Sequence, residues 1–414
     1  MRTWIGWIGL AVGMTLLSGA GCQKKADIAV AVDPNANAKL ASPEPIKKIA
    51  KVEIPDENYE LKFTKAEETP PVAKRSSLDR LDRNELTPED RQRWPAETVA
   101  VIPGPAGVSV RDLAFTPDQS RLVRALLDGS FEFWDVTGAR PRLLSKTDPD
   151  ERLTKVRCRA FSSDGQWLAT IHGVPGNTLR LWKLSDSGNL RLVDSREFKR
   201  VEDVAFHPNG KMLVCGSIGA DRFAVSDQGL TPLAGSFPGA HGCYTFVGPG
   251  DAFASPVFNQ ARNGPLYCSE MKIWNIADDR ISESLLLQHD RHVKALAVSR
   301  DRKLVATSCL ELKVWIWDVT AVPPTKRTPF TVSRWMKDLH LTTDGQYLIA
   351  IPYADDVIVW NLQKDRQEKA LHFSPAGKGT SVGFSANALA ADDRHLAIST
   401  NAVTLILRLS SAAK

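Results

Sequence analysis

The strongest indication of the fold in this sequence is an internal repeat. From about residue 97 onward, apolar runs of four to seven residues alternate with turns built on Asp or Asn, and no long helical periodicity is present. In three units, sixteen residues separate the turn Asp from a Trp: 118–134, 301–317 and 344–360. The other units fit the same or a longer spacing, so seven units are predicted to end at 134, 182, 225, 274, 317, 360 and 408.

The ends of these units resemble the WD40 repeat. Trp134-Asp135 and Trp317-Asp318 carry the Trp-Asp pair, and three further units end in Trp followed by Lys or Asn. The period of 43–49 residues with short strands supports the resemblance. It implies an all-β fold, a seven-bladed β-propeller over residues 95–414, in which each sheet packs its faces on its neighbours.

The resemblance also predicts how the ring closes and what fills it. The last unit stops after its third strand, 403–409, and the segment 97–102 is a spare strand that would complete the seventh blade. Core positions between blades are predicted for five tryptophans, Trp134, Trp182, Trp274, Trp317 and Trp360. WD40 blades are often held together by a His, a Ser or Thr, the strand-end Trp and a turn Asp, and few units of this chain carry these residues. The candidates are His289 with Trp317 as its partner, and the turn acids Asp128 and Asp355 or Asp356.

The N-terminus reads as an export signal. Residues 3–21 follow Arg2 without a single charge, which is typical of a signal peptide over residues 1–21. Its end, Ala20-Gly21-Cys22, resembles the bacterial lipoprotein signal, although Gly19 stands where that signal prefers Leu. Lipidation of Cys22 would anchor the protein to a membrane on its extracytoplasmic side, in the periplasm or at the cell surface. An uncleaved membrane anchor and ordinary secretion are the alternatives.

Residues 22–94 are predicted to be a disordered tether. They are rich in Ala, Pro, Lys and acidic residues and poor in large apolar side chains, so they bury too little surface to offset their ordering entropy. A short helix is expected near 87–94, with Thr87 as N-cap, Pro88 in the first turn, and an end at Trp94-Pro95.

Two features are candidates for binding a partner. One aligned position of the innermost strands reads Arg111, Arg157, Glu202, Cys243, Lys294, Lys337 and Ser385. In WD40 folds this position lies near the mouth of the central channel, and four basic residues in seven would favour an acidic peptide, a phosphate-bearing ligand or an anionic sugar polymer. Alternatively, these side chains pair with Asp112, Asp203 and Asp338. The second candidate is the loop 259–265, with Arg262.

The sequence carries no motif typical of nucleic-acid binding, catalysis, or cofactor or metal binding. A net charge of +5 among 101 charged side chains does not indicate a nucleic-acid partner. The chain has no Gly-rich phosphate loop, no GxSxG and no HExxH, and we expect neither a cofactor nor a metal. Cys243 and Cys268 fall in the fourth blade and are either a disulfide or two thiols.

These observations favour a non-catalytic protein–protein interaction scaffold, monomeric and lipid-anchored, that binds a protein or an anionic ligand at the propeller face and channel mouth. Two alternatives remain. One is a propeller hydrolase or lyase that uses channel carboxylates such as Asp112, Asp203 and Asp338. The other is an envelope-assembly factor that binds client strands at an exposed blade edge.

Overall fold

The structure is a computed structural model that describes most of residues 78–409 and two short stretches before them, 60–61 and 63–65. The gaps within 78–409 are 106, 149–155, 174–176, 185–189, 218, 248–250, 259–268, 278–279, 290, 300, 302, 322, 328, 374–381, 391 and 401. The predicted signal peptide, Cys22, Arg262 and Cys268 lie outside the described residues. No helix in the described part of the chain is long and apolar enough to cross a membrane.

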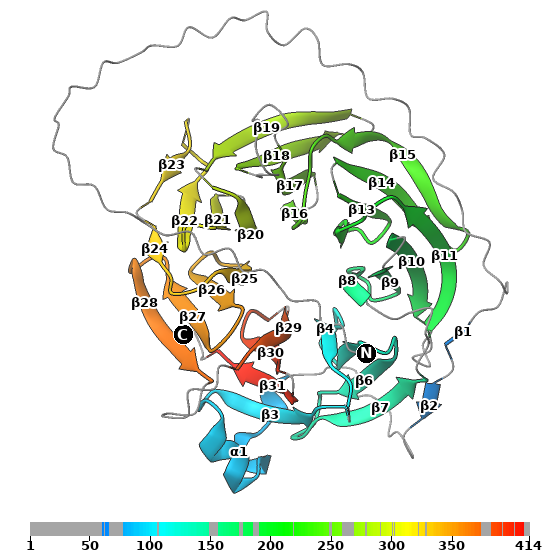
Figure 1. Ribbon diagram of the computed structural model, residues 1–414, viewed down its shortest axis with the longest axis vertical. Coiled ribbons are helices and arrows are strands. Elements are labelled where there is room, and N and C mark those ends of the chain that lie inside the picture. The colour runs from blue at the N-terminus through cyan, green and yellow to red at the C-terminus, as the bar shows by residue number, and fades with distance from the viewer. Residues whose placement is uncertain are drawn as a thin grey trace, which may run out of the picture. The chain divides into compact units, whose positions relative to one another are not determined.

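Seven antiparallel sheets stand around a central axis as a β-propeller, which confirms the predicted fold class (Figure 1). Blades 1 and 2 are built from β4 (Val110–Phe115), β5 (Arg121–Leu126), β6 (Phe131–Asp135), β7 (Arg142–Thr147), and β8 (Val156–Phe161), β9 (Trp167–His172), β10 (Asn177–Leu184), β11 (Leu190–Phe198). Blades 3 and 4 are built from β12 (Asp203–Phe206), β13 (Met212–Ser217), β14 (Gly219–Ser226), β15 (Gly229–Phe237), and β16 (Thr245–Val247), β17 (Ala252–Val257), β18 (Glu270–Ala277), β19 (Arg280–Gln288).

The remaining three blades continue this order. Blade 5 contains β20 (Val293–Val298), β21 (Leu304–Cys309) and β22 (Lys313–Asp318), with the short β23 (Thr325–Lys326) and β24 (Phe330–Thr331) both paired to β22. Blade 6 contains β25 (Met336–Leu341), β26 (Tyr347–Pro352), β27 (Asp356–Asn361) and β28 (Arg366–His372). Blade 7 contains β29 (Phe384–Leu389), β30 (His395–Thr400), β31 (Val403–Arg408) and, from the other end of the chain, β3 (Thr98–Pro103).

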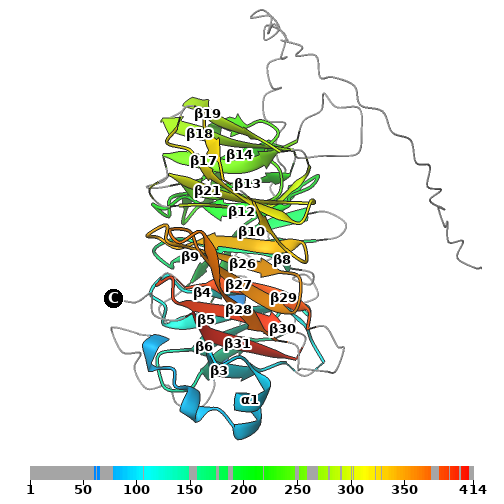
Figure 2. The ribbon, with the colours of Figure 1, turned by 90° about the vertical axis from the view of Figure 1, so that its left-hand side faces the viewer.

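The seventh blade closes the ring as predicted. β3 pairs antiparallel with β31, so Pro103 faces Val403 and Thr98 faces Leu407. Because the first and last strands of the propeller share one sheet, opening the ring requires breaking this strand pair. Figure 2 shows β3 beside β31, with the short helix α1 (Pro88–Arg93) next to β3.

The hydrogen-bond register corrects two of the predicted unit ends. The position that carries Trp in five blades pairs with the same place on the second strand throughout; in blades 3 and 7 the residue at that position is Phe223 and Leu407, not Val225 and Arg408. A constant spacing failed there because the hairpin between the second and third strands is shorter. In blade 3, Ser217 already pairs with Gly219 across that turn.

The tryptophans fill the space between blades, in agreement with their predicted core role. Trp182, Trp274, Trp317 and Trp360 are at most 6% exposed, and each packs in a cluster shared with the preceding blade. Trp134 is half-buried against the blade 7–1 cluster. Each blade thus buries apolar surface only through its neighbours, which makes stability a property of the closed ring.

Part of the predicted tether packs on the propeller. β1 (Glu60–Leu61) and β2 (Phe63–Lys65) pair with the outer strands β11 and β7. The turns η1 (Leu78–Arg80) and η2 (Arg83–Glu85) precede α1, whose N-cap is Thr87 as expected. Leu78 and Leu81 are each 1% exposed in the cluster between blades 7 and 1. Their burial offsets the entropy of ordering this segment, so residues that precede the repeats also pack on the propeller.

Candidate functional site

The innermost strands of the propeller bring the predicted binding position to one cavity. Strand register shifts, the mark of a β-bulge, occur at Arg111, Arg157, Lys294, Lys337 and Ser385 as each inner strand begins. Bulges re-aim side chains beside functional sites. Except for Arg157, whose side chain is not described, these residues line a cavity of about 740 Å³ at the channel mouth, together with Glu202 and Cys243.

The basic side chains at the mouth differ in their surroundings. Arg111 and Lys294 are exposed, and neither forms an ion pair with any residue in the described ranges. Lys337 is half-buried and its ammonium group donates hydrogen bonds to the carbonyl oxygens of Phe384 (3.1 Å) and Ser385 on blade 7. Burial lowers the pKa of Lys337. Lys337 therefore links blades 6 and 7. Of the basic side chains that the structure describes at this aligned position, Arg111 and Lys294 are the accessible ones.

Carboxylates lie beside the basic residues at the mouth. The described lining contains four of them, Asp112, Glu202, Asp203 and Asp338, against three Lys or Arg residues. The three Asp side chains each accept a hydrogen bond from the backbone N–H of the next residue, at 2.8–2.9 Å. Asp203 also accepts one from the N–H of Tyr244 (2.6 Å), which joins blade 3 to blade 4. These carboxylates hold the bulged strand ends, and the mouth is a surface of mixed charge.

One sector beside the mouth brings together two histidines from the connections that precede β16 and β20. His241 Nε2 lies 3.1 Å from Glu202 Oε2, and the His241 and His292 rings are 6.5 Å apart. Cys243 Sγ lies 3.5 Å from the carbonyl oxygen of Lys294. Burial lowers the pKa of His241, and burial together with Lys294 lowers the pKa of His292 to about 4. Within the described ranges, no group of three or more His, Cys, Asp or Glu residues could hold a metal ion.

This sector predicts a pH dependence of stability. His292 is neutral in the folded state down to about pH 4, whereas an unfolded His binds a proton near pH 6.5. Between these values the unfolded state binds more protons, so the free energy of unfolding falls as the pH is lowered from 6.5 to 4. Urea denaturation across this range should show a shallower fall for His292→Gln than for wild type. Parallel curves would contradict the assignment.

An exposed aromatic pair beside the mouth was missed by sequence reasoning. Trp335 is 52% exposed and Tyr353 is 53% exposed, while large apolar side chains elsewhere in the described chain are, except for Leu286, mostly covered. Both lie on blade 6, where the Tyr353 N–H donates to the Trp335 carbonyl oxygen (3.4 Å), and Tyr353 lines the cavity. Aromatic side chains of this kind are enriched in protein–protein interfaces. The sequence could have indicated this pair, because Trp335 lies outside the position at which Trp recurs in the repeats.

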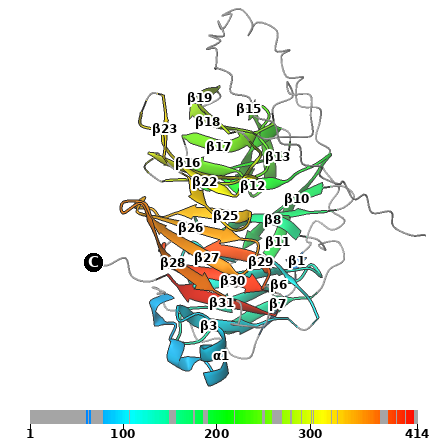
Figure 3. The ribbon, with the colours of Figure 1, turned by 60° about the vertical axis from the view of Figure 1, so that its left-hand side comes forward.

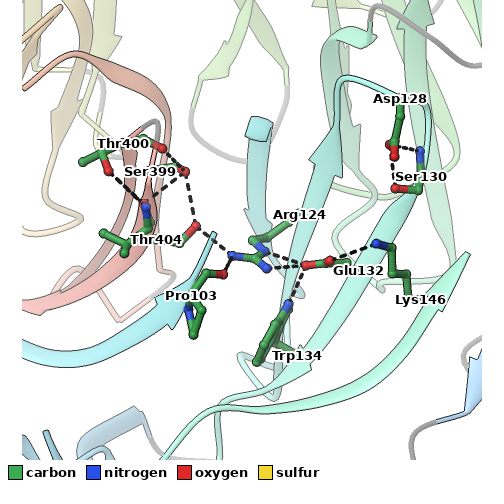
Figure 4. Close-up of polar contacts among 11 residues, drawn as sticks. Pro103, Arg124, Asp128, Ser130, Glu132, Trp134, Lys146, Ser399, Thr400 and Thr404 are labelled. Atoms are coloured by element: carbon green, nitrogen blue, oxygen red, sulfur yellow. Dashed lines mark hydrogen bonds and ion pairs between the residues drawn. The ribbon is translucent and has the colours of Figure 1, made fainter. Parts of the chain in front are cut away.

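A second missed feature is a buried ion pair at the ring closure (Figure 4). Arg124, 1% exposed, donates through Nε to Glu132 Oε2 (2.8 Å) and through Nη1 to the Pro103 carbonyl oxygen (2.8 Å). Trp134 Nε1 also donates to Glu132 Oε2, at 3.1 Å. Arg124 thus connects blade 1 to β3 of blade 7. The sequence could have revealed this pair, because Arg124 and Glu132 are charged residues within the otherwise apolar neighbouring strands 121–126 and 131–135.

The indole N–H groups of two repeat tryptophans donate hydrogen bonds to Thr side chains within their own blades. In blade 5, Trp317 Nε1 donates to Thr307 Oγ1 (3.0 Å) and the predicted partner His289 packs edge-on at 5.1 Å between ring centres. In blade 2, Trp182 Nε1 donates to Thr170 Oγ1 (2.8 Å).

The predicted turn acids each have a partner near their turn. Asp128 accepts hydrogen bonds from Ser130. Asp355 accepts from the N–H of Val382, and Asp356 lies 2.7 Å from a ring nitrogen of His372.

Comparison with known proteins agrees with this geometry. The family described as WD domain, G-beta repeat matches residues 193–224 and 282–318, each running from the outer strand of one blade to the third strand of the next. The chain is similar to WD repeat and SOCS box-containing protein 1 of Homo sapiens, at 34% identity over 108 residues, 26% of this chain. The chain spans about a quarter (24%) of the length of that relative. We conclude that the chain carries WD40 repeats and folds as a seven-bladed β-propeller.

Proposed function

We propose that this protein is a non-catalytic scaffold that binds a partner protein at the mouth of its central channel. The observation that carries the proposal is the mouth itself, where bulged inner strands surround a cavity of about 740 Å³. Two exposed cations, Arg111 and Lys294, and the exposed Tyr353 line this cavity. Aromatic residues and Arg are enriched in protein interfaces, which supports a protein as the partner.

The same surface supports an acidic segment as the part of the partner that enters the mouth. Arg111 and Lys294 have unused hydrogen-bond donors toward the described residues, whereas the Asp side chains already accept backbone hydrogen bonds. An anionic group can thus pair with the cations without displacing an internal contact. The enzyme alternative is less well supported, because those Asp side chains serve the strand ends.

The proposed location is the extracytoplasmic side of a bacterial membrane, through a lipid on Cys22. Its support is the uncharged run 3–21 that ends in Ala20-Gly21-Cys22. Stable anchoring of this kind requires more than one acyl chain. Replacement of Cys22 by Ser should release the protein from membranes, and fractionation of cells measures this directly. Retention of the Ser variant on membranes would contradict lipid anchoring.

The binding proposal is tested by cross-linking in cells that express the full chain. We expect Arg111→Glu/Lys294→Glu to reduce recovery of the specific partner at least fivefold, because reversed charges repel an acidic segment. The matched control is Lys211→Glu/Lys303→Glu, which changes two exposed cations on turns between first and second strands, away from the mouth. Equal partner recovery from both double variants would overturn the proposal.

A further inference from the structure

The repeat position that fills the blade interfaces has one exception. Across blades 1 to 7 the register equates Trp134, Trp182, Phe223, Trp274, Trp317, Trp360 and Leu407. Six of these side chains are aromatic, and Leu407 alone is aliphatic. Since each of these residues faces the preceding blade, the interface between blades 6 and 7 receives the smallest side chain of the seven.

A cavity of about 780 Å³ lies at this interface. Its apolar walls include Ile349 and Val359 of blade 6 and Leu409 of blade 7. Ile349, Val359 and Lys369 stand opposite one another across β26, β27 and β28, so they form one row on the face toward blade 7. Figure 3 shows these strands beside β29, β30 and β31. The volume is in the range of sites that enclose a ligand.

The interface already takes an aromatic side chain from outside the repeats. Trp94, which follows α1, is 5% exposed in the cluster between blades 6 and 7. Ile349 and Leu409 belong to that cluster and also line the cavity. An indole from another segment therefore packs here, and space for a further side chain remains.

Most charged side chains at the rim already have partners within the protein. Glu368 pairs with Lys364 (3.1 Å) and Asp392 with His395 (2.7 Å). Asp344 accepts hydrogen bonds from Thr342 Oγ1 (2.6 Å) and the Gln346 N–H (2.9 Å), and Asp393 accepts from the Thr343 N–H (2.6 Å). The rim cations Lys369 and Arg394 are paired with Glu97 and Asp79.

Arg366 is the remaining rim cation. It is exposed and forms no ion pair within the described chain. Its guanidinium group presents five donors that match a carboxylate.

We propose that the cavity between blades 6 and 7 is a second docking site, which binds an extended peptide of a partner protein with an aromatic side chain followed by an acidic one. The aromatic ring packs against the partly exposed Val359 on the apolar wall of the cavity, and the carboxylate pairs with Arg366. The site shares no described lining residue with the channel mouth. This inference builds on the proposed scaffold function and adds the chemistry of a second partner segment.

The test is calorimetric titration of the full chain with two capped tetrapeptides, Ala-Trp-Glu-Ala and Ala-Trp-Lys-Ala. Wild type should bind the Glu peptide saturably and about threefold to fivefold more tightly than the Lys peptide, as one exposed ion pair predicts. Arg366→Gln should abolish this preference. Arg280→Gln is the matched control, because Arg280 is the exposed first residue of the corresponding strand in blade 4.

A filling variant tests the cavity itself. Val359→Trp should abolish binding of both peptides while circular dichroism and the melting temperature stay near wild type, and Val359→Ala should retain binding. Absence of saturable binding to wild type, or unchanged binding to Val359→Trp, would overturn the proposal, as would binding of free N-acetyltryptophan but of neither peptide. Arg111→Glu/Lys294→Glu should bind the peptides normally, which separates this test from that of the channel mouth.

Discussion

Replacing Arg124 by Met should lower the free energy of unfolding by about 3–5 kcal/mol, the usual effect of removing one partner of a buried ion pair. The substitution leaves Glu132, whose side chain is 6% exposed, without its main counter-charge. Lys146 Nζ lies 3.6 Å from Glu132 Oε1, but its side chain is 39% exposed and compensates weakly. Urea denaturation followed by circular dichroism measures the change.

The double variant Arg124→Met/Glu132→Leu distinguishes the loss of the ion pair itself from the cost of leaving the Glu132 carboxylate buried without a counter-charge. We expect it to recover most of the lost stability, because both charges are removed and the apolar side chains fill similar space. Arg142→Ala is the control, since the Arg142–Asp135 pair on the same sheet is partly exposed (44% and 13%) and should contribute less than about 1 kcal/mol. If the double variant is no more stable than Arg124→Met, the desolvation argument fails.

The Arg124 substitution should also loosen the ring closure. Arg124 Nη1 donates to the Pro103 carbonyl oxygen on β3 and lies 3.4 Å from Thr404 Oγ1 on β31. Without these contacts, amide hydrogen exchange in 98–103 should quicken more than exchange in blade 4, on the far side of the ring. Uniform quickening would indicate general destabilisation and not a local effect on the closure.

Replacing Trp182 by Ala should cost about 3–5 kcal/mol, the range for deleting a large aromatic side chain from a core. Trp182 is fully buried between blades 1 and 2, where its ring lies 6.5 Å from that of Phe131, and it donates a hydrogen bond to Thr170. Trp182→Phe keeps part of the packing and loses the hydrogen bond, so its cost should be smaller. Denaturation midpoints of the two variants separate packing from the hydrogen bond.

Trp335→Ala is the matched control for the same substitution at an exposed site. Its side chain is 52% exposed, so the change in unfolding free energy should stay within about 0.5 kcal/mol. Comparable losses at Trp182 and Trp335 would contradict the account of the repeat tryptophans as the packing between blades.

Much of the candidate site follows from the repeat. Once the inner strands are aligned, the position of Arg111, Lys294 and Lys337 near the channel follows from their place in each unit. The accessibility of each side chain does not follow, because it depends on the neighbouring blade: Lys337 reaches carbonyl oxygens of blade 7, and Asp203 reaches the backbone of blade 4. Nor does the linear pattern reveal that Tyr353 lines the cavity.

The sequence was enough to predict the propeller, its seven blades and the strand that closes it, because its repeated strand and turn pattern resembles that of WD40 repeats. It also determined α1, whose Thr87 cap is a local interaction. Other features emerged only from the three-dimensional structure: Phe223 and Leu407 occupy the Trp position, Leu78 and Leu81 join the core, and Arg124 contacts Thr404, 280 residues away in the sequence. Those features depend on hairpin length and on contacts between distant segments, which spacing along the chain does not encode.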